Sequence, residues 1–341
     1  MSKLWQKKNC ITHSAVNKFI VSQNLMADRE LLPFDIIASK AHARMLAHVG
    51  LISKREGQAL VRALEEAGHL EKKGRFQLAP QDEDCHTALE NYLVKKLGPT
   101  GKKIHTGRSR NDQVLVAMRL YTKNKLAEVA QSTVELGKTL LDFARHYEFS
   151  PMPGYTHTQP AMPSSIGQWA GAFVESLLGD LELLSAVIKF NDQNPLGSAS
   201  GFGTALPIDR EYTTRLLGFK KTQQNTLYCQ NSRGKIESAI LSALVQIGLT
   251  LNKIANDVIW FTSREFSFFA VADELTTGSS IMPQKKYLDI MEVVLANVST
   301  IISSQIQAEC VSHNLLSGYN KDLKITKLPL MEALQMVKDS C

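Results

Sequence analysis

One segment combines the residue types of an anion-binding catalytic loop. It runs from Gly278 to Glu292 and begins Gly-Ser-Ser-Ile-Met-Pro-Gln-Lys-Lys. The small residues at its start allow the backbone to approach a ligand closely. Lys285 and Lys286 place positive charge near the hydroxyl of Ser279, which could serve as a nucleophile or a base. The segment therefore suits an anionic substrate, although an ordinary polar connection before a helix has a similar composition.

Two further polar segments contain side chains that packing does not explain. Residues 105–113 are rich in hydrogen-bond donors, and arginines such as Arg110 can bind carboxylates through two hydrogen bonds. Residues 154–160 place His157 among hydroxyl and amide groups that could fix its tautomer. His157 is therefore the best single candidate for proton transfer. The alternatives are a solvated helix cap in the first segment and a structural histidine in the second.

A glycine-rich segment at residues 197–204 does not have the features of a nucleotide site. It lacks the Gly-Lys-Ser/Thr of a phosphate-binding loop, and no strand precedes it in the sequence pattern. We therefore expect no nucleotide cofactor. The histidines, cysteines and acidic residues show no metal-ligand spacing along the chain, so we expect no metal either.

The elements that must position these segments are helices. Apolar residues recur every three or four positions in four long stretches, at residues 126–143, 173–188, 240–261 and 290–301. Shorter helical patterns occupy residues 34–49 and 53–67, and a capping box at Ser53 and Glu56 marks the start of the second. We therefore predict an all-α fold with a central bundle of long helices.

The pattern at residues 240–251 is apolar over a wider arc than one packing seam needs. This favours an oligomer, in which neighbouring copies cover the additional face. A self-sufficient monomeric bundle and a coiled-coil scaffold are the alternatives.

Composition limits the partners and the compartment. The chain has 341 residues, of which 44% are hydrophobic, and a net charge of +6 that is spread along the sequence rather than gathered in one tract. This argues against nucleic acid as the main partner. The five cysteines form no Cys-x-x-Cys pair, and no apolar run is long enough to span a bilayer. We therefore expect a cytoplasmic protein with reduced thiols and no membrane association.

Taken together, the polar segments resemble those of the fumarase and aspartase superfamily and, within it, the argininosuccinate lyase family. Residues 278–283 are similar to the superfamily signature, and residues 284–286 and 106–113 to the version found in argininosuccinate lyases. Supporting matches lie at residues 38–43, 83–86, 153–157, 206–210 and 319–323. The resemblance covers nearly the whole chain.

The resemblance implies an all-α, fumarase/aspartase-like fold, and clusters of helix breakers near residues 106–110 and 317–322 divide the chain into three regions. These are a small N-terminal helical domain at residues 1–105, the long-helix bundle at residues 106–316, and a substrate-contacting segment with a final helix at residues 317–341. The small C-terminal helical domain that usually follows is expected to be missing. The resemblance also implies a homotetramer whose active sites each draw residues from three chains. The implied reaction is the reversible, cofactor-independent cleavage of argininosuccinate to arginine and fumarate, through an aci-carboxylate intermediate.

The resemblance also assigns roles to individual residues. Ser279 matches the serine that abstracts the proton, and His157 matches a histidine placed as the acid, or as the base in other assignments, and oriented by Glu292. His86 and Lys285 complete the anion pocket. The positions that match substrate-binding residues are Ser39, Arg110, Asn111, Thr156, Tyr319 and Lys327.

Three positions depart from the family pattern. Tyr287 and Leu288 stand where the family has Asn-Pro, and Lys324 stands where a glutamine is usual. Tyr287 replaces an amide expected to hold a substrate carboxylate, and Lys324 adds positive charge near the predicted guanidinium end. These departures leave two alternatives open. One is a catalytically impaired or silent member with a structural or regulatory role, and the other is a fumarate-releasing lyase for another N-substituted aspartate.

Overall fold

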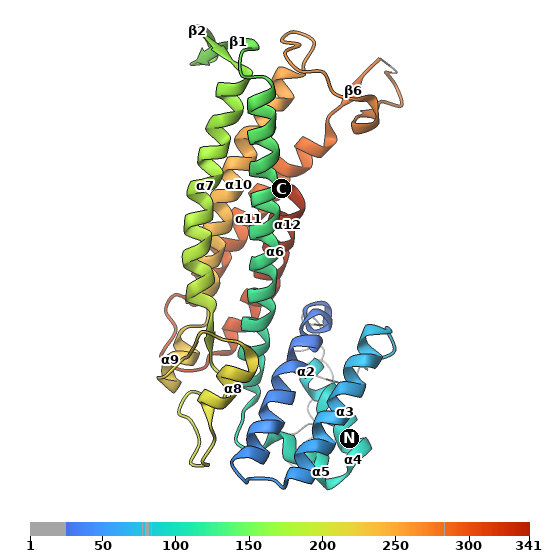
Figure 1. Ribbon diagram of the computed structural model, residues 1–341, viewed down its shortest axis with the longest axis vertical. Helices are drawn as coiled ribbons and strands as arrows, with labels where there is room; N and C mark the ends of the chain where they lie inside the picture. The colour runs from blue at the N-terminus through green and yellow to red at the C-terminus, as the bar shows by residue number, and fades with distance from the viewer. Residues whose placement is uncertain (1–24, 77, 79–81, 83, 283) are drawn as a thin grey trace. The chain divides into compact units, whose positions relative to one another are not determined.

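The computed structural model describes residues 25–76, 78, 82, 84–282 and 284–341 (Figure 1). Glu83 and Pro283, which belong to two of the sequence motifs, lie outside the described residues. The described chain is mainly helical, and its strands are confined to three two-stranded sheets. The predicted all-α fold with long helices is therefore confirmed.

Contacts divide the chain into two compact units that are discontinuous in sequence. Unit 1 consists of the described residues up to 121, with residues 192–232 and 316–320. Unit 2 consists of the described residues within 122–191, 233–315 and 321–341. The sequence prediction used continuous domains at residues 1–105, 106–316 and 317–341. That division remains a prediction, and the two units are described separately below.

The helices of unit 1 differ widely in length, from the single turn of α5 to the 24 residues of α2. They are α2 (Leu25–His48), α3 (Lys54–Lys72), α4 (Cys85–Leu97), α5 (Pro99–Lys102), η1 (Lys103–His105), α8 (Arg210–Leu217) and α9 (Thr226–Asn231). The predicted capping box is confirmed, because the Ser53 amide donates to Glu56 Oε2 at 2.9 Å and the Glu56 amide donates to Ser53 Oγ at 3.2 Å. Gly57 lets α3 cross α2 closely, since a Cβ there would lie 2.7 Å from Ala47 Cβ.

Unit 2 is a bundle of long helices. Its members are most of α6 (Arg110–His146), α7 (Ile166–Asn191), α10 (Lys235–Phe261) and α11 (Asp289–Ser312), with η3 (Lys321–Thr326) and α12 (Lys327–Ser340). Helix α10 packs against α7, α11 and α12. The first part of the predicted apolar seam of α10 is buried, including Ile240, Leu244 and Ile247, whereas its last residues are half-buried. At ~1.5 Å rise per residue, this helix is roughly 40 Å long.

The long helices also carry apolar side chains that this chain leaves exposed. They include Leu178 and Leu183 on α7, Leu249 on α10, and Val293 and Ile306 on α11. In the part of the chain that the structure describes, α10 alone is long and apolar enough to cross a membrane, yet 56% of its apolar window is buried inside the protein. Burial of this kind is typical of the core helix of a bundle.

An unpredicted hairpin joins α6 to α7. Strands β1 (Pro151–Thr156) and β2 (Gln159–Ser165) pair antiparallel, and His157 and Thr158 form the turn between them. Both turn residues have positive φ, at 53° and 60°. Turns of this kind normally use asparagine and glycine, so a β-branched threonine here is strained. The other strands are short pairs: β3 (Gln193–Asn194) with β4 (Lys221–Thr222), and β5 (Thr277–Gly278) with β6 (Lys286–Tyr287).

Candidate active site

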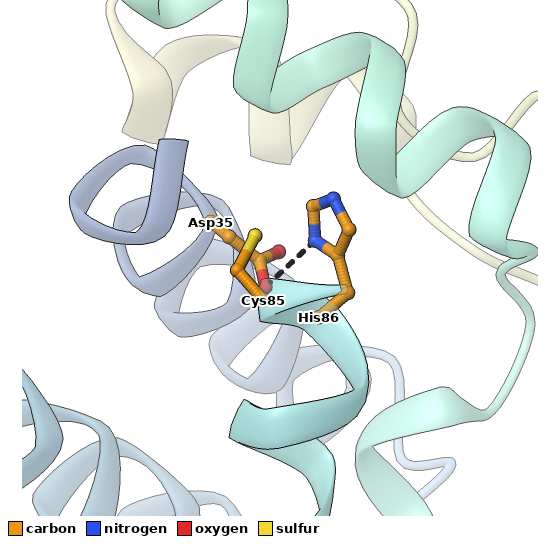
Figure 2. A group of neighbouring side chains, drawn as sticks. All are labelled: Asp35, Cys85 and His86. Atoms are coloured by element: carbon orange, nitrogen blue, oxygen red, sulfur yellow. Dashed lines mark ion pairs between the residues drawn. The ribbon is translucent and has the colours of Figure 1, made fainter. Parts of the chain in front are cut away.

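In unit 1, a fully buried carboxylate holds His86. Nδ1 of His86 lies 2.9 Å from Oδ2 of Asp35, and neither side chain is exposed to solvent (Figure 2). The two residues come from different helices, α4 and α2. No described residue hydrogen-bonds to Nε2 of His86. The imidazole is therefore oriented through one nitrogen, while the other is buried without a hydrogen-bond partner among the described residues.

The Asp35 carboxylate is well supported. The side-chain amide of Gln113 donates to both of its oxygens, at 3.0 and 3.2 Å. Burial alone would raise the pKa of Asp35, but the charge and hydrogen bond of His86, with the charge of Arg108, hold the pKa below its ordinary value. Asp35 is thus an ionised anchor for the groups around it.

Cys85 lies beside this pair, and Asp35, Cys85 and His86 each offer a ligand atom within 4.8 Å of the others (Figure 2). Sequence spacing could not reveal this group because Asp35 lies on another helix. The Asp35 oxygens already accept hydrogen bonds from Gln113, and the guanidinium of Arg108 adds positive charge nearby. These surroundings oppose the binding of a metal cation by the three residues. They favour a structural role, in which the Asp35–His86 ion pair positions the imidazole.

The two arginines of the 106–113 motif join the same cluster. Arg108 is buried and donates from Nη1 to Ser39 Oγ at 2.9 Å. Arg110, the first residue of α6, lies within ion-pair distance of Asp84 at 3.5 Å and of Glu90 at 3.6 Å. Arg110 keeps 26% of its side-chain surface exposed, so it can still meet an anion.

The structure thus brings together in unit 1 four of the predicted site residues. These are Ser39, His86, Arg110 and Asn111. Asn111 is half-buried in the first turn of α6. We refer to these four as the unit 1 group.

Asp112 explains the role of the glycine-rich segment. Its carboxylate accepts hydrogen bonds from the backbone amides of Ser109, Gly197 and Ala199, at 2.8, 2.8 and 3.1 Å. The segment is therefore tied to the start of α6, next to Arg110 and Asn111. The short strand β3 precedes this segment, so the expectation that no strand does was wrong, although the sequence still lacks the Gly-Lys-Ser/Thr of a phosphate-binding loop.

We expect Asp112 to titrate at an unusually high pH. Burial raises the pKa of its carboxyl group to about 6, against 3.8 ordinarily, although the three amides oppose this. Between these values the folded state binds more protons than the unfolded state, so stability falls as the pH rises. The ionised group then costs about 3 kcal/mol above pH 6. Carbon-13 NMR of aspartate carboxyls, assigned with Asp112→Asn, should show a midpoint near 6, and a midpoint at or below 4 would contradict this.

The remaining catalytic candidates lie in unit 2, near the C-terminal end of α10. The hairpin is anchored there because Tyr155 packs edge-on against Phe266, just beyond α10, with ring centroids 5.8 Å apart. Its turn presents His157 to solvent, and Thr156 is also exposed. The signature loop is tied to the same region, since Arg264 donates to the backbone carbonyl of Gln284 at 3.1 Å. Figure 1 shows the hairpin and the loop at the same end of the unit 2 bundle.

Within the signature loop, Ser279 sits against backbone donors. Its Oγ accepts hydrogen bonds from the amides of Ile281 at 3.3 Å and Met282 at 3.1 Å. Lys285 is exposed, and its Nζ lies 5.9 Å from the centre of the Tyr287 ring. The departure at Tyr287 thus places an aromatic ring beside the loop's lysine. We refer to His157, Thr156, Ser279 and Lys285 as the loop group.

Glu292 lies in the first turn of α11 with its side chain exposed. Among the described residues of one chain, no hydrogen bond joins it to His157. Its predicted role in orienting that imidazole remains a prediction.

Two other candidates lie at the opposite end of the unit 2 bundle. Lys324 belongs to η3, and the largely buried Lys327 begins α12. Their neighbour Leu323 lies against Gly234, the residue that precedes α10, because a Cβ there would be 3.1 Å from Leu323 Cδ2. The length of α10, roughly 40 Å, therefore separates these lysines from the loop group within one chain. Tyr319 belongs to residues 316–320 of unit 1.

The sequence pattern of a known family of lyases matches residues 9–303 of this chain. The chain therefore belongs to this family of lyases. Within the family, it groups with the argininosuccinate lyases. It is 44% identical to the argininosuccinate lyase of Thermotoga neapolitana over 99% of this chain and 84% of that one. It is 42% identical to the enzyme of Phocaeicola vulgatus over 99% of this chain and 75% of that one.

Solved structures agree on the fold. A class II fumarase from Schistosoma mansoni matches with a TM-score of 0.77 at 17% identity, over 92% of this chain and 74% of that chain. An EDDS lyase in complex with formate matches with a TM-score of 0.73 at 20% identity, over 91% of this chain and 62% of that chain. The predicted fumarase/aspartase-like architecture is thus confirmed.

Several residues that surround the unit 1 group were not singled out from the sequence. Arg108, Asp112 and Gln113 lay inside a motif that was recognised, so their positions carried some signal. Asp35 contacts His86 from another helix, and Gln113 donates to Asp35. Glu90 lies 3.0 Å from His105 and 3.6 Å from Arg110. Nothing in the spacing of Asp35 relative to His86 could have revealed their contact.

Proposed function

We propose that this protein cleaves argininosuccinate to arginine and fumarate by β-elimination, as an enzyme of arginine biosynthesis. The observation that carries the proposal is the 40–44% identity to argininosuccinate lyases over 99% of the chain. The signature loop with its serine and paired lysines lies within that match. The donor-rich clusters described above supply what the chemistry needs.

The reaction begins with proton abstraction by Ser279. A serine hydroxyl is a weak base unless its alkoxide is stabilised, and two backbone amides already point at its Oγ. The Ser279 hydroxyl first gives its own proton to water. The alkoxide then takes a proton from the carbon beside a substrate carboxylate, and the C–H electron pair passes into that carboxylate. The result is an aci-carboxylate dianion. Lys285 is the mobile cation best placed on the loop to stabilise it.

Collapse of the dianion breaks the carbon–nitrogen bond and forms the double bond of fumarate. The departing nitrogen needs a proton, and His157 is the proposed donor, oriented by Glu292. The unit 1 group, with Arg110 and the free Nε2 of His86, binds the substrate carboxylates. Thr156, Tyr319 and Lys327 are proposed to bind the rest of the substrate. The proposed reaction needs no cofactor or metal.

We propose a homotetramer in which each active site draws residues from three chains. Two observations support this. Within one chain, Lys324 and Lys327 lie about the length of α10 away from the loop group. The exposed apolar side chains of α7, α10 and α11 also favour contact with another chain, because a single chain leaves them open to solvent. We further propose that the protein works in the cytoplasm, without nucleic acid or membrane partners.

The test is a fumarate assay on purified protein. Adding argininosuccinate should raise the ultraviolet absorbance of fumarate, and arginine should form in equal amount. A panel of other N-substituted aspartates, which release the same product, tests whether Lys324 has changed the preferred leaving group. No fumarate from argininosuccinate above the level of a His157→Ala control would contradict the proposed activity.

Tyr287 offers a graded test of the alternative, a catalytically impaired family member. Its ring lies beside Lys285, so Tyr287→Asn should free the lysine and restore an amide that can hold a carboxylate. We expect kcat/KM to rise by about tenfold, which corresponds to one good hydrogen bond. Tyr155→Phe, on the hairpin, serves as a control. An unchanged or lower kcat/KM would show that Tyr287 does not limit the reaction.

A further inference from the structure

Unit 1 contains a pocket that none of the proposed catalytic residues lines. It has a volume of about 620 Å³ and lies between the end of α2, the first half of α3 and α8. The close crossing of α2 and α3 at Gly57 and Ala47 forms part of its wall. Its volume falls within the range of small-molecule sites, roughly 300–1,000 Å³.

The lining of this pocket is strongly cationic. Arg44 and His48 come from α2, and Lys54 and Arg62 from α3. Gln58 and Tyr212 add neutral polar groups, and none of the lining residues is acidic. The two arginines and the lysine form no ion pair with a residue that the structure describes. The carboxylate of Glu65 interacts electrostatically with Arg44, but it is already paired with Lys40 at 2.9 Å.

Two interactions hold the lining in place. The rings of His48 and Tyr212 stack at 4.3 Å between centroids and 4° between planes, which joins α2 to α8. Arg62 donates from Nε to the backbone carbonyl of Gln58 at 3.4 Å, so its terminal nitrogens remain available. Uncompensated like charges repel one another, and an anion that bridges them would remove this repulsion. Guanidinium groups bind phosphate and carboxylate oxygens through paired hydrogen bonds.

We propose that this pocket is a second anion site, separate from the active site, which binds a small molecule with at least two phosphate or carboxylate groups. Such a ligand bridges Arg44 on α2 and Arg62 on α3, and Lys54 neutralises its remaining charge. Helix α2 also carries Ser39 of the unit 1 group and Asp35, the carboxylate that holds His86. Occupancy therefore stabilises the helix that supports the anchor of His86.

Inorganic pyrophosphate is the first probe, and citrate is the second. Isothermal titration should detect binding, and the thermal midpoint should rise because the ligand binds the folded state. The double variant Arg44→Gln with Arg62→Gln should bind at least about tenfold more weakly, since two charge-assisted contacts are lost. Comparison of pyrophosphate with citrate shows whether the site prefers phosphate or carboxylate groups. Affinity should also fall as the salt concentration rises.

Two controls separate this pocket from other anion sites. Arg55→Gln removes an exposed arginine of the same helix that does not line the pocket, and it should bind as the unmodified protein does. Arg110→Gln removes an arginine of the proposed active site, and it should also retain binding. Equal affinity in the double variant, or loss of binding only in Arg110→Gln, would overturn the proposal. Because binding is measured without turnover, the result stands whatever the fumarate assay shows.

Discussion

Replacing Ser279 by alanine is expected to lower kcat for fumarate formation by about a thousandfold, the size of effect that a general base contributes. The physical reason is local. The Ser279 oxygen accepts hydrogen bonds from the amides of Ile281 and Met282, and these donors stabilise the alkoxide that takes the proton. The substitution removes the base and leaves the loop backbone intact. The measurement is steady-state fumarate formation with argininosuccinate.

Ser280→Ala is the matched control for this prediction. Ser280 is the adjacent, exposed serine, and no described residue hydrogen-bonds to its hydroxyl. Its replacement should change kcat by less than about threefold, as expected for a surface position. If Ser280→Ala lost as much activity as Ser279→Ala, or if Ser279→Ala remained active, the assignment of the base would be wrong. Circular dichroism should show unchanged helix content in both variants.

The second prediction with a large expected effect is that two variants, each inactive alone, recover activity when their chains assemble together. If active sites are shared between chains, Ser279→Ala and Asn111→Leu damage different contributions to each site. Co-expressed chains carrying two different affinity tags form mixed assemblies. Some sites then combine the intact loop of one chain with the intact unit 1 group of another. For random mixing of equal amounts in a symmetric oligomer, about a quarter of the sites should be native.

The control pairs two variants of the same loop. Ser279→Ala with Lys285→Ala should recover no activity, because every site receives one defective loop whichever chain supplies it. Recovery in this control would point to exchange or contamination rather than shared sites. Absence of recovery in the first pair, with mixed assemblies verified by both tags, would show that each chain builds its own site.

Helices were the most predictable part of the fold. The capping box at Ser53 and Glu56 and the apolar seam of α10 are local patterns, and both are present in the structure. The hairpin at residues 151–165 was not predicted, because its strands contain prolines and no simple alternation of apolar residues. The positive φ angles of His157 and Thr158 also carry no clear signature, since neither is a glycine or an asparagine.

By itself, the sequence determined the fold class, the family and the identity of most candidate residues. These depend on periodicity and on ordered motifs, which are properties of short segments. The tertiary structure decided which residues act together. It joined Asp35 to His86, and Asp112 to the glycine-rich segment. It also placed Lys327 about the length of α10 away from Ser279. The physical reason is that contacts between distant segments arise from packing, which spacing along the chain does not encode.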